Sequence, residues 1–331
     1  MPKFSFIIPT YNACKHLDVC LKSIREQVFP QGEVEIIVAD GGSLDNTIEI
    51  AKNYGSLILN NEKRLAEYGV GLGMKEAKGE LSVVFAADNE LVGKDWLPLV
   101  WSVFENNRDI SALWGRLASG INDPALNKYF ELIQSDPLNW FLNDNLKVYK
   151  KNARLIAPFC LKFKVDPRRP LVWGANGLVY RTQKIRPSWV KDAYMGDNDA
   201  FQSMIERGDN TVVYFERPFV YHHHVAQVSD WVRKWRRNFL HHFADKQDSR
   251  NMNWVIITGF KRKLIMWIFY NLFIFISFGH SVYLAIRDKN RYWLYHPLIS
   301  FLQCWTYIFL VLGTKKGRDF LGRRSDGKLK V

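Results

Sequence analysis

Cysteine is scarce in this chain of 331 residues, which contains only Cys14, Cys20, Cys160 and Cys304. No two of them have the spacing of a zinc-ligand pair, and so few in a long chain do not make a disulfide framework. We interpret them as ordinary thiols in a reducing compartment. The apolar run after Met1 is too short to predict a signal peptide, so we expect the N-terminal domain to stay in the cytoplasm.

Internal repeats, low-complexity tracts and a readable nucleic-acid-binding module are also missing. Hydrophobic residues make up 47% of the chain and charged residues 24%, which excludes a disordered or fibrous protein. The net charge of +13 is uneven: from Trp231 onward 19 Lys and Arg face 5 Asp and Glu, whereas the remainder has 27 against 28. Basic residues beside apolar runs indicate contact with membrane lipids rather than nucleic acid.

Two long apolar segments near the C-terminus contain no Asp, Glu, Lys or Arg: 264–286 and 294–313. Each reaches the roughly 20 residues that a membrane-spanning helix needs. We predict a membrane helical hairpin over 264–313, with both ends cytoplasmic and a basic tail over 314–331. A re-entrant or interfacial pair is the alternative. It is favoured by the polar and helix-breaking residues Asn271, His280, Pro297 and Gln303.

A basic, aromatic stretch precedes the hairpin. Within 229–243, Trp231, Trp235 and Phe239 recur at helical spacing, and four Lys or Arg residues lie between them. A helix of this composition is typical of the membrane interface. We therefore predict an amphipathic interfacial segment over 226–263.

The first 90 residues alternate between apolar strands and amphipathic helices. The expected strands are 4–9, 34–39, 56–60 and 81–87, and the expected helices are 16–27 and 45–54. Such alternation predicts a parallel sheet, whose ligands bind at the carboxyl ends of its strands. The polar residues at those ends are Thr10, Tyr11, Asn12, Asp40 and Asp88. Farther on, we expect helices near 125–135 and over 198–207, and a strand over 211–221 that is broken by Pro218.

Four motifs resemble those of the family 2 glycosyltransferases, which have the GT-A fold. They are FSFIIPTYNACKHLDVCLKSI at 4–24, EIIVADGGSLDNT at 35–47, AKGELSVVFAADNEL at 77–91 and GDNDAF at 196–201. The resemblance implies an α/β fold: a Rossmann-like, mostly parallel GT-A domain over 1–225, followed by a helical, membrane-associated C-terminal region. The donor half would be about 1–95 and the acceptor half about 96–225.

The resemblance implies that residues at or after the ends of the first four strands bind the nucleotide sugar. They are Pro9, Tyr11, Asn12, Asp40, Gly42, Arg64 and Asp88. In the family, the aspartate at the position of Asp40 accepts a hydrogen bond from the nucleobase, and a donor-phosphate contact is expected near Arg64. The alternatives are a turn-forming role for Asp40, in which Gly42 allows a tight turn, and a solvated surface position for Arg64.

Asp88 is the central candidate for a divalent metal, Mg²⁺ or Mn²⁺, which would neutralise the leaving diphosphate. The family pattern is Asp-X-Asp, but Ala86 stands at its first position, so Glu90 is the further carboxylate that could assist. His223, which follows the expected strand over 211–221, is a third candidate ligand. Packing is the alternative role for the histidine, and helix capping is the alternative for Asp88.

The acidic motif at 196–201 resembles the one that supplies the catalytic base of inverting members. That base takes the proton of the acceptor hydroxyl. Either Asp197 or Asp199 fits, and helix capping is the alternative for both. Arg233 and Trp235 fall where relatives have an aromatic and basic motif near the acceptor, although interfacial anchoring would account for them as well.

These observations predict an inverting glycosyltransferase of the hexosyltransferase type that acts in glycan or polysaccharide biosynthesis. Its partners would be a nucleotide-sugar donor, membrane lipids and a lipid-linked saccharide acceptor, with no nucleic acid. It would lie on the membrane with its catalytic domain on the cytoplasmic side. The alternatives are a polyprenyl-phosphate sugar synthase and an inactive homologue that acts as a membrane scaffold, which Ala86 and Asn198 favour.

Overall fold

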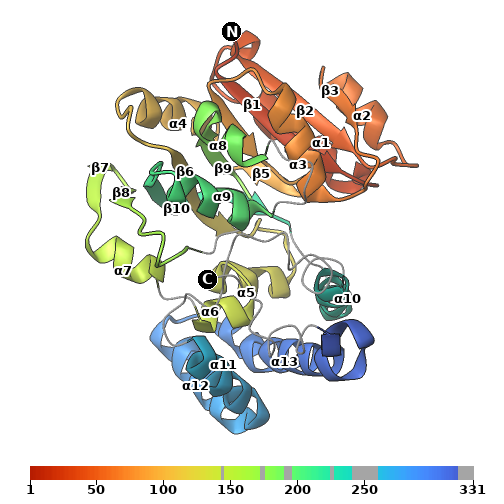
Figure 1. Cartoon of the computed structure of the whole chain (residues 1–331), viewed down its shortest axis with the longest axis vertical. Helices are drawn as coiled ribbons and strands as arrows, with labels where there is room; N and C mark the ends of the chain where they lie inside the picture. The colour runs from red at the N-terminus through yellow and green to blue at the C-terminus, as the bar shows by residue number, and fades with distance from the viewer. Residues whose placement is uncertain (143–144, 172–175, 190–195, 224–226, 241–259, 320–331) are drawn as a thin grey trace. The chain divides into compact units, whose positions relative to one another are not determined.

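The computed structural model describes residues 1–142, 145–171, 176–189, 196–223, 227–240 and 260–319. Contacts divide the chain into two units, the first of Met1–Gly120 and Asn145–His223 and the second of Ile121–Asp144 and His224–Val331 (Figure 1). The segment 121–144, which we expected inside the first domain, groups with the C-terminal helices. The reason is packing, since Tyr129 and Phe130 share a buried apolar cluster with Trp231.

The first unit is built on a ten-stranded mixed sheet with the order β3-β2-β1-β4-β9-β6-β10-β8-β7, and β5 pairs with β10. Its strands are β1 Phe4–Thr10, β2 Val34–Asp40, β3 Leu57–Asn60, β4 Leu81–Val84, β5 Asn89–Leu91, β6 Ala112–Ala118, β7 Arg154–Ala157, β8 Cys160–Lys164, β9 Leu178–Arg181 and β10 Thr211–His222. The first four are mutually parallel, as the sequence predicts, so their carboxyl ends share one edge. The predicted α/β class is confirmed.

Helices cover both faces of this sheet. They are α1 Cys14–Arg25, α2 Thr47–Asn53, α3 Ala66–Glu76, α4 Trp96–Glu105, α7 Asn145–Lys151, α8 Thr182–Trp189 and α9 Asp197–Glu206, with a short 3₁₀ turn at Gln31–Glu33. The apolar spacing predicts the buried face of α1, since Leu17, Cys20, Leu21 and Ile24 are all buried. β10 is not interrupted at Pro218; the chain absorbs the proline as a register shift against β6.

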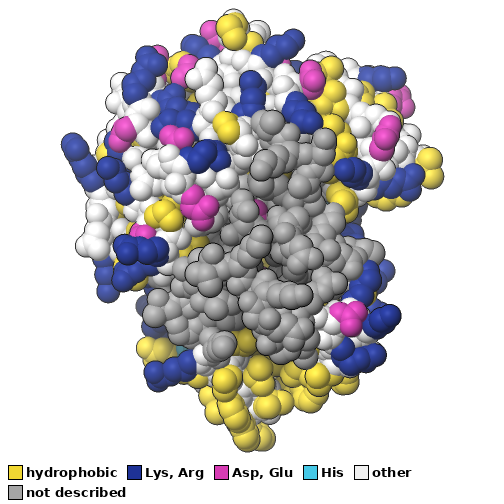
Figure 2. Space-filling view, in the orientation of Figure 1, with side chains coloured by type: hydrophobic (Ala, Val, Ile, Leu, Met, Phe, Trp, Pro, Cys, Tyr) yellow, Lys and Arg dark blue, Asp and Glu magenta, His cyan; other side chains and the backbone are white. Residues whose placement is uncertain are grey.

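The second unit is helical. Its elements are α5 Ala125–Ile133, α6 Pro137–Leu142, α10 Val228–Asn238, α11 Phe260–Leu272, α12 Ile274–Arg287, a 3₁₀ turn at Arg291–Tyr295 and α13 His296–Gly313. The segment 264–286, expected as one helix, is two helices that meet at an angle of 94°. Among the described residues, only Arg291–Gly313 is by itself long and apolar enough to cross a membrane. Figure 2 shows apolar side chains gathered at the end of this unit that α11 and α12 form.

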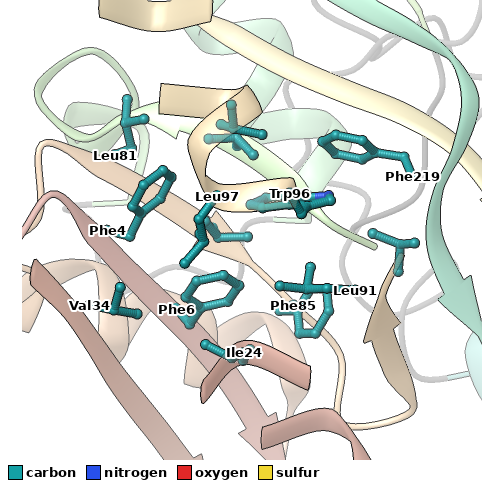
Figure 3. Close-up of a cluster of buried hydrophobic side chains, with 14 of the residues drawn as sticks. Phe4, Phe6, Ile24, Val34, Leu81, Phe85, Leu91, Trp96, Leu97 and Phe219 are labelled. Carbon is teal, nitrogen blue, oxygen red and sulfur yellow. The ribbon is translucent and has the colours of Figure 1, made fainter. Parts of the chain in front are cut away.

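The alternation of side chains along β1 builds two cores in the first unit. Phe4, Phe6 and Ile8 face a cluster with α1 and α4, while Ile7 faces α3, α8 and α9 on the opposite side. Figure 3 shows the first cluster, in which Phe6 lies near Trp96 of α4. The ring centroids of these two residues are 6.1 Å apart. Both cores hold β1 rigidly, and with it the strand end that carries Tyr11.

Glycine in α3 lets that helix approach the sheet closely. A Cβ added at Gly73 would lie 2.4 Å from Cγ2 of Ile7, whereas one at Gly71 would meet only Cε3 of Trp189 at 3.9 Å. Gly73→Ala should therefore lower the free energy of unfolding by about 1 kcal/mol or more, because overpacking costs about 1–3 kcal/mol and exceeds the gain in helix propensity.

The matched control for this prediction is Gly71→Ala, which keeps the propensity gain without the clash. It should raise the free energy of unfolding by about 0.5–1 kcal/mol. Urea denaturation of both variants measures the difference. Equal stabilisation by the two alanines would show that α3 does not need a glycine at position 73.

Candidate active site

The loops after β1, β2 and β3 meet at the carboxyl edge of the sheet. The guanidinium carbon of Arg64 lies 5.6 Å from the centroid of the Tyr11 ring, which is 49% exposed. Gly42 has a φ of +82°, and a Cβ there would lie 3.6 Å from Nη2 of Arg64. The sequence placed these three residues at a common site, and the structure brings them together. The exposed aromatic ring can pack against a nucleobase or a sugar ring, and the neighbouring guanidinium can bind a phosphate.

Asp40 is almost fully buried, and four donors surround its carboxylate. Oδ1 accepts hydrogen bonds from the hydroxyls of Thr10, at 2.8 Å, and Ser43, at 2.5 Å. Oδ2 accepts from the backbone N–H groups of Gly42 and Ser43, at 2.9 and 2.8 Å. In this arrangement the carboxylate holds the DGGS turn. A nucleobase would reach it only by replacing one of these partners.

Asn12 joins the two neighbouring loops. Its side-chain oxygen accepts from the backbone N–H of Leu44 at 2.9 Å, and its own N–H donates to Ser43 Oγ at 2.8 Å. Its φ of +48° is one that asparagine tolerates better than most residues. Asn12 therefore shapes the pocket wall in this structure. Pro9 packs against α3 beside it. A Cβ added at Gly69 of α3 would lie only 3.1 Å from the Cβ of Pro9.

A second polar cluster forms where β5 pairs with the end of β10. The backbone N–H of His223 donates to the carbonyl of Asp88 at 2.9 Å, and His223 Nε2 lies 3.2 Å from Glu90 Oε2. The side chain of His222, a residue that the sequence analysis did not single out, faces the Asp88 carboxylate, with 3.6 Å between Nε2 and Oδ2. Strand pairing brings residues 88–90 and 222–223 together, although more than 130 positions separate them.

Asn176 orients His222. Its amide nitrogen lies 3.3 Å from Nδ1 of His222, and its oxygen accepts from the amide of Asn89 at 3.3 Å. With Nδ1 as the acceptor, the Nε2 proton of a neutral His222 faces Asp88. Sequence reasoning missed Asn176 because only the sheet brings it next to β10. The His222 ring thus faces the Asp88 carboxylate at a distance longer than a hydrogen bond.

The carboxylate oxygens of this cluster are suitable ligands for a divalent cation whose remaining coordination positions are filled by phosphate oxygens. The side chains of Asp88 and Glu90 are 30% and 35% exposed, so their oxygens are accessible. Over the described ranges, no group of three His, Cys, Asp or Glu residues forms a ready-made metal site. Mg²⁺ is commonly held by one or two carboxylates together with substrate phosphates. A site of that kind needs no third protein ligand.

Three carboxylates gather between the first turns of α3 and α9. Asp199 is buried, and Oδ1 of Asp197 is buried without a hydrogen-bond partner among the described residues. Burial, followed by the charges of Glu67 and Asp199, raises the pKa of Asp197 to about 7. A carboxyl group with such a pKa can accept a proton near neutral pH. Glu67, which sequence reasoning missed, lies three residues after Arg64 and ties this cluster to the same edge of the sheet.

Arg233 and Trp235, predicted to lie near the acceptor, belong to α10 in the second unit. Trp235 is buried in the core of that unit, 4.5 Å from the ring of Trp231 and 6.3 Å from that of Tyr307. Arg233 is exposed and pairs with Asp230. The aromatic spacing, from which we predict an interfacial helix, is the buried stripe of an amphipathic helix, and the acceptor contact that the resemblance implies stays a prediction.

Known proteins resemble this chain mainly over its first half. The family model described as Glycosyl transferase family 2 matches residues 5–162. Over 103 residues the chain is 34% identical to poly(ribitol-phosphate) beta-N-acetylglucosaminyltransferase TarS of Staphylococcus aureus, a match that covers 29% of this chain and 18% of TarS. Over 90 residues it is 36% identical to dolichyl N-acetyl-alpha-D-glucosaminyl phosphate 3-beta-D-2,3-diacetamido-2,3-dideoxy-beta-D-glucuronosyltransferase of Methanococcus voltae, covering 25% of this chain and 28% of that protein. These matches thus span less than a third of either relative.

A solved structure extends the likeness of fold to the whole chain. The mannosyltransferase PcManGT from Pyrobaculum calidifontis, in complex with GDP-Man and Mn2+, superposes with a TM-score of 0.51 at 14% identity. The alignment covers 100% of this chain and 81% of that one. Residues 5–162 are therefore similar to family 2 of the glycosyltransferases, and the solved structure shows a shared fold.

Proposed function

We propose that the chain is an inverting glycosyltransferase that moves a sugar from a nucleoside-diphosphate donor to a hydroxyl group. The observation that carries this proposal is that the first unit supplies the three kinds of group that the reaction needs. Tyr11 and Arg64 form a surface for a nucleotide, Asp88 lies in the turn between β4 and β5, and Asp197 offers a carboxyl group whose pKa is about 7.

In this proposal Tyr11 and Arg64 hold the donor. The ring packs against the nucleoside, while the guanidinium donates hydrogen bonds to phosphate oxygens in a planar, forked geometry. Asp88, assisted by Glu90 and His223, would hold a divalent cation, which neutralises charge on the departing diphosphate. His222 keeps the Asp88 carboxylate in place.

Asp197 acts as the base. Its carboxylate takes the proton of the acceptor hydroxyl as the oxygen attacks the anomeric carbon and the nucleoside diphosphate leaves from the opposite face. Burial, and after it the charges of Glu67 and Asp199, raise the pKa of Asp197 to about 7, which suits this task. Asp199 is the more deeply buried of the two candidates, and we assign it the role of tuning Asp197 rather than accepting the proton itself.

A lipid-linked saccharide is the acceptor that we propose, with the catalytic site on the cytoplasmic side. The support is the exposed apolar surface of the second unit and the name of the Methanococcus voltae relative, which acts on a dolichyl-linked sugar phosphate. A polyprenyl phosphate would be the acceptor of a synthase, which needs no strong base. Ala86 and Asn198 are the residues that favour an inactive scaffold instead.

A panel of nucleotide sugars, assayed with a membrane lipid extract and Mn²⁺, tests the proposal. Release of nucleoside diphosphate together with label in a saccharide-lipid supports it. Transfer that survives only with added polyprenyl phosphate identifies the synthase. Absence of both binding and turnover with every donor identifies the scaffold.

Asp40→Ala should weaken binding of the nucleoside diphosphate by about tenfold or more, because the turn beside Tyr11 loses four hydrogen bonds. The free energy of unfolding should fall by about 1–3 kcal/mol for the same reason. Calorimetric titration and urea denaturation measure the two effects. Asp45→Ala, which loosens the same loop farther from Tyr11, is the control. Unchanged affinity in Asp40→Ala would restrict Asp40 to a turn-forming role.

A further inference from the structure

The angle between α11 and α12 prevents them from acting as one membrane-spanning helix. The two helices contain 13 and 14 residues and meet at Phe273 at 94°. At about 1.5 Å per residue each is about 20 Å long, whereas the hydrocarbon core of a bilayer is about 30 Å thick. If both helices are equally inclined, their meeting point reaches a depth of about 14 Å, which is close to the thickness of one leaflet.

The apolar side chains of this pair point outward where the helices meet. Five consecutive residues are exposed there, and the most exposed, Phe275, is 85% accessible. They are Leu272, Phe273, Ile274, Phe275 and Ile276. Ile265, Met266 and Phe269 on α11 and Phe278 on α12 extend the surface, which Figure 2 shows as the apolar end of the unit. An apolar patch of this extent is costly in water and marks a contact surface.

The polar side chains of the same segment are turned inward. Asn271 is fully buried and donates to the carbonyl of Trp267 at 2.7 Å. His280 Nδ1 lies 3.0 Å from the hydroxyl of Tyr270. Gln303 of α13 is likewise buried and donates to Asp136 at 2.8 Å. The residues that argued against an apolar segment in the sequence therefore serve the interior of the unit, and the outer surface stays apolar.

Cations stand at the two ends of the pair that lie away from the apolar tip. Arg262 is exposed at the start of α11, and Arg287, Lys289 and Arg291 are exposed at or just after the end of α12. Each basic residue close to an anionic membrane surface adds attraction. Along the chain the apolar tip thus lies between two groups of cations. Such an arrangement lets the tip enter a leaflet while the cations stay at its anionic surface.

α13, although long enough, packs against a helix that cannot enter hydrocarbon. Tyr307 of α13 lies 6.3 Å from Trp235 and 5.9 Å from Phe239, ring to ring. The intervening residues of α10 include the exposed Arg236 and Arg237. If α13 crossed the bilayer, α10 would be carried with it, and charged side chains are strongly disfavoured there.

We propose that α11 and α12 form a wedge, residues 262–287, that inserts residues 272–276 into one leaflet of an anionic bilayer. None of the helices that the structure describes then crosses the bilayer, and the two ends of α13 face the same side of the membrane. This inference goes beyond sugar transfer and does not depend on it. It replaces the spanning hairpin expected from the sequence with the interfacial pair.

Cysteine labelling tests the topology in the full-length protein. Phe275→Cys, Arg291→Cys and Lys315→Cys are made separately, and sealed inverted membrane vesicles from the expressing cells are treated with an impermeant maleimide. Peptide mass spectrometry reads each site. Cys14, the one native thiol that is partly exposed, marks the side of the first unit.

The wedge predicts that positions 291 and 315 are labelled from the same side as Cys14, and that position 275 is labelled at least about tenfold more after the membranes are dissolved in SDS. Labelling of 291 and 315 from opposite sides would show that α13 spans. Full labelling of 275 in intact vesicles would show that the tip is not in lipid.

A charge substitution gives an independent measurement. Phe275→Asp should lower partition of the full-length protein onto phosphatidylcholine–phosphatidylglycerol vesicles by about tenfold or more, while the equally acidic Val28→Asp, at a 71% exposed site of the first unit, should not. Thermal melting checks that both variants fold. Equal partition of the two variants would overturn the wedge, as would recovery of the unaltered protein in the soluble fraction.

Discussion

Replacing Asp88 with alanine is expected to lower kcat of sugar transfer by about 10²–10³-fold or more, the size of effect seen when a group that stabilises developing charge is removed. Asp88 follows the strand next to β1, beside the diphosphate position that we propose. The His222 ring faces its carboxylate at 3.6 Å, and its carbonyl accepts a hydrogen bond from the backbone N–H of His223. The measurement is turnover with Mn²⁺ at saturating donor.

Two controls separate chemistry from folding. The unfolding curve of Asp88→Ala should match that of the parent to within about 1 kcal/mol, since the side chain is partly exposed and its loss leaves no large cavity. Glu90→Gln should keep more activity than Asp88→Ala, because Glu90 is proposed only to assist. Near-normal turnover of Asp88→Ala would remove this residue from the metal site and favour a mechanism that needs no metal.

Asp197→Asn is expected to lower kcat/KM by about 10²–10⁴-fold, the usual contribution of a positioned general base. The amide keeps the shape of the side chain but cannot take the proton. Asp199→Asn should have a smaller effect on rate at high pH, since it removes a neighbouring negative charge and leaves the base in place. A larger loss in Asp199→Asn than in Asp197→Asn would reverse the assignment.

The pH dependence of the parent provides a second readout. The base works as carboxylate, so kcat/KM should rise as pH increases through about 7, the pKa to which burial and the two neighbouring carboxylates raise Asp197. In Asp199→Asn the midpoint should move to lower pH, because one of those charges is gone. A rate that stays constant between pH 5 and 9 would exclude a base with this pKa.

The free energy of unfolding of the parent should fall as pH rises, whereas its kcat/KM increases. Because the folded pKa of Asp197 is raised above its ordinary value of 3.8, the fold favours the protonated carboxyl, and this contribution to stability is lost as pH rises through about 7. At pH 8 the free energy of unfolding of Asp197→Asn should therefore exceed that of the parent by at least about 1 kcal/mol, although the variant loses activity. Urea denaturation of both proteins at pH 5 and pH 8 measures how this difference in the free energy of unfolding changes with pH.

The donor side of the site was largely predictable from the sequence, because its signals are local. Alternating apolar runs placed the ends of β1 and β2 to within one residue and the end of β4 to within three. Parallel strands bring such ends to one edge whatever the rest of the chain does. Tyr11, Gly42 and Arg64 were therefore identified as neighbours before any distance was known. The boundaries of α1 differ from those predicted by two residues at each end, since helix ends depend on caps rather than on the apolar stripe.

Tertiary structure decided the features that depend on residues far apart in the chain. Pairing of β5 with β10 turned the His222 ring toward the Asp88 carboxylate and the His223 ring toward Glu90. The meeting of two helix starts put Glu67 beside Asp197. Periodicity cannot tell a buried aromatic stripe from a ligand surface, so only packing showed that Trp235 belongs to a core. Hydropathy measures length and composition but not direction. The 94° bend at Phe273, which turns an apparent membrane span into two short helices, is set by the packing of α11, α12 and α13 and is invisible in the sequence.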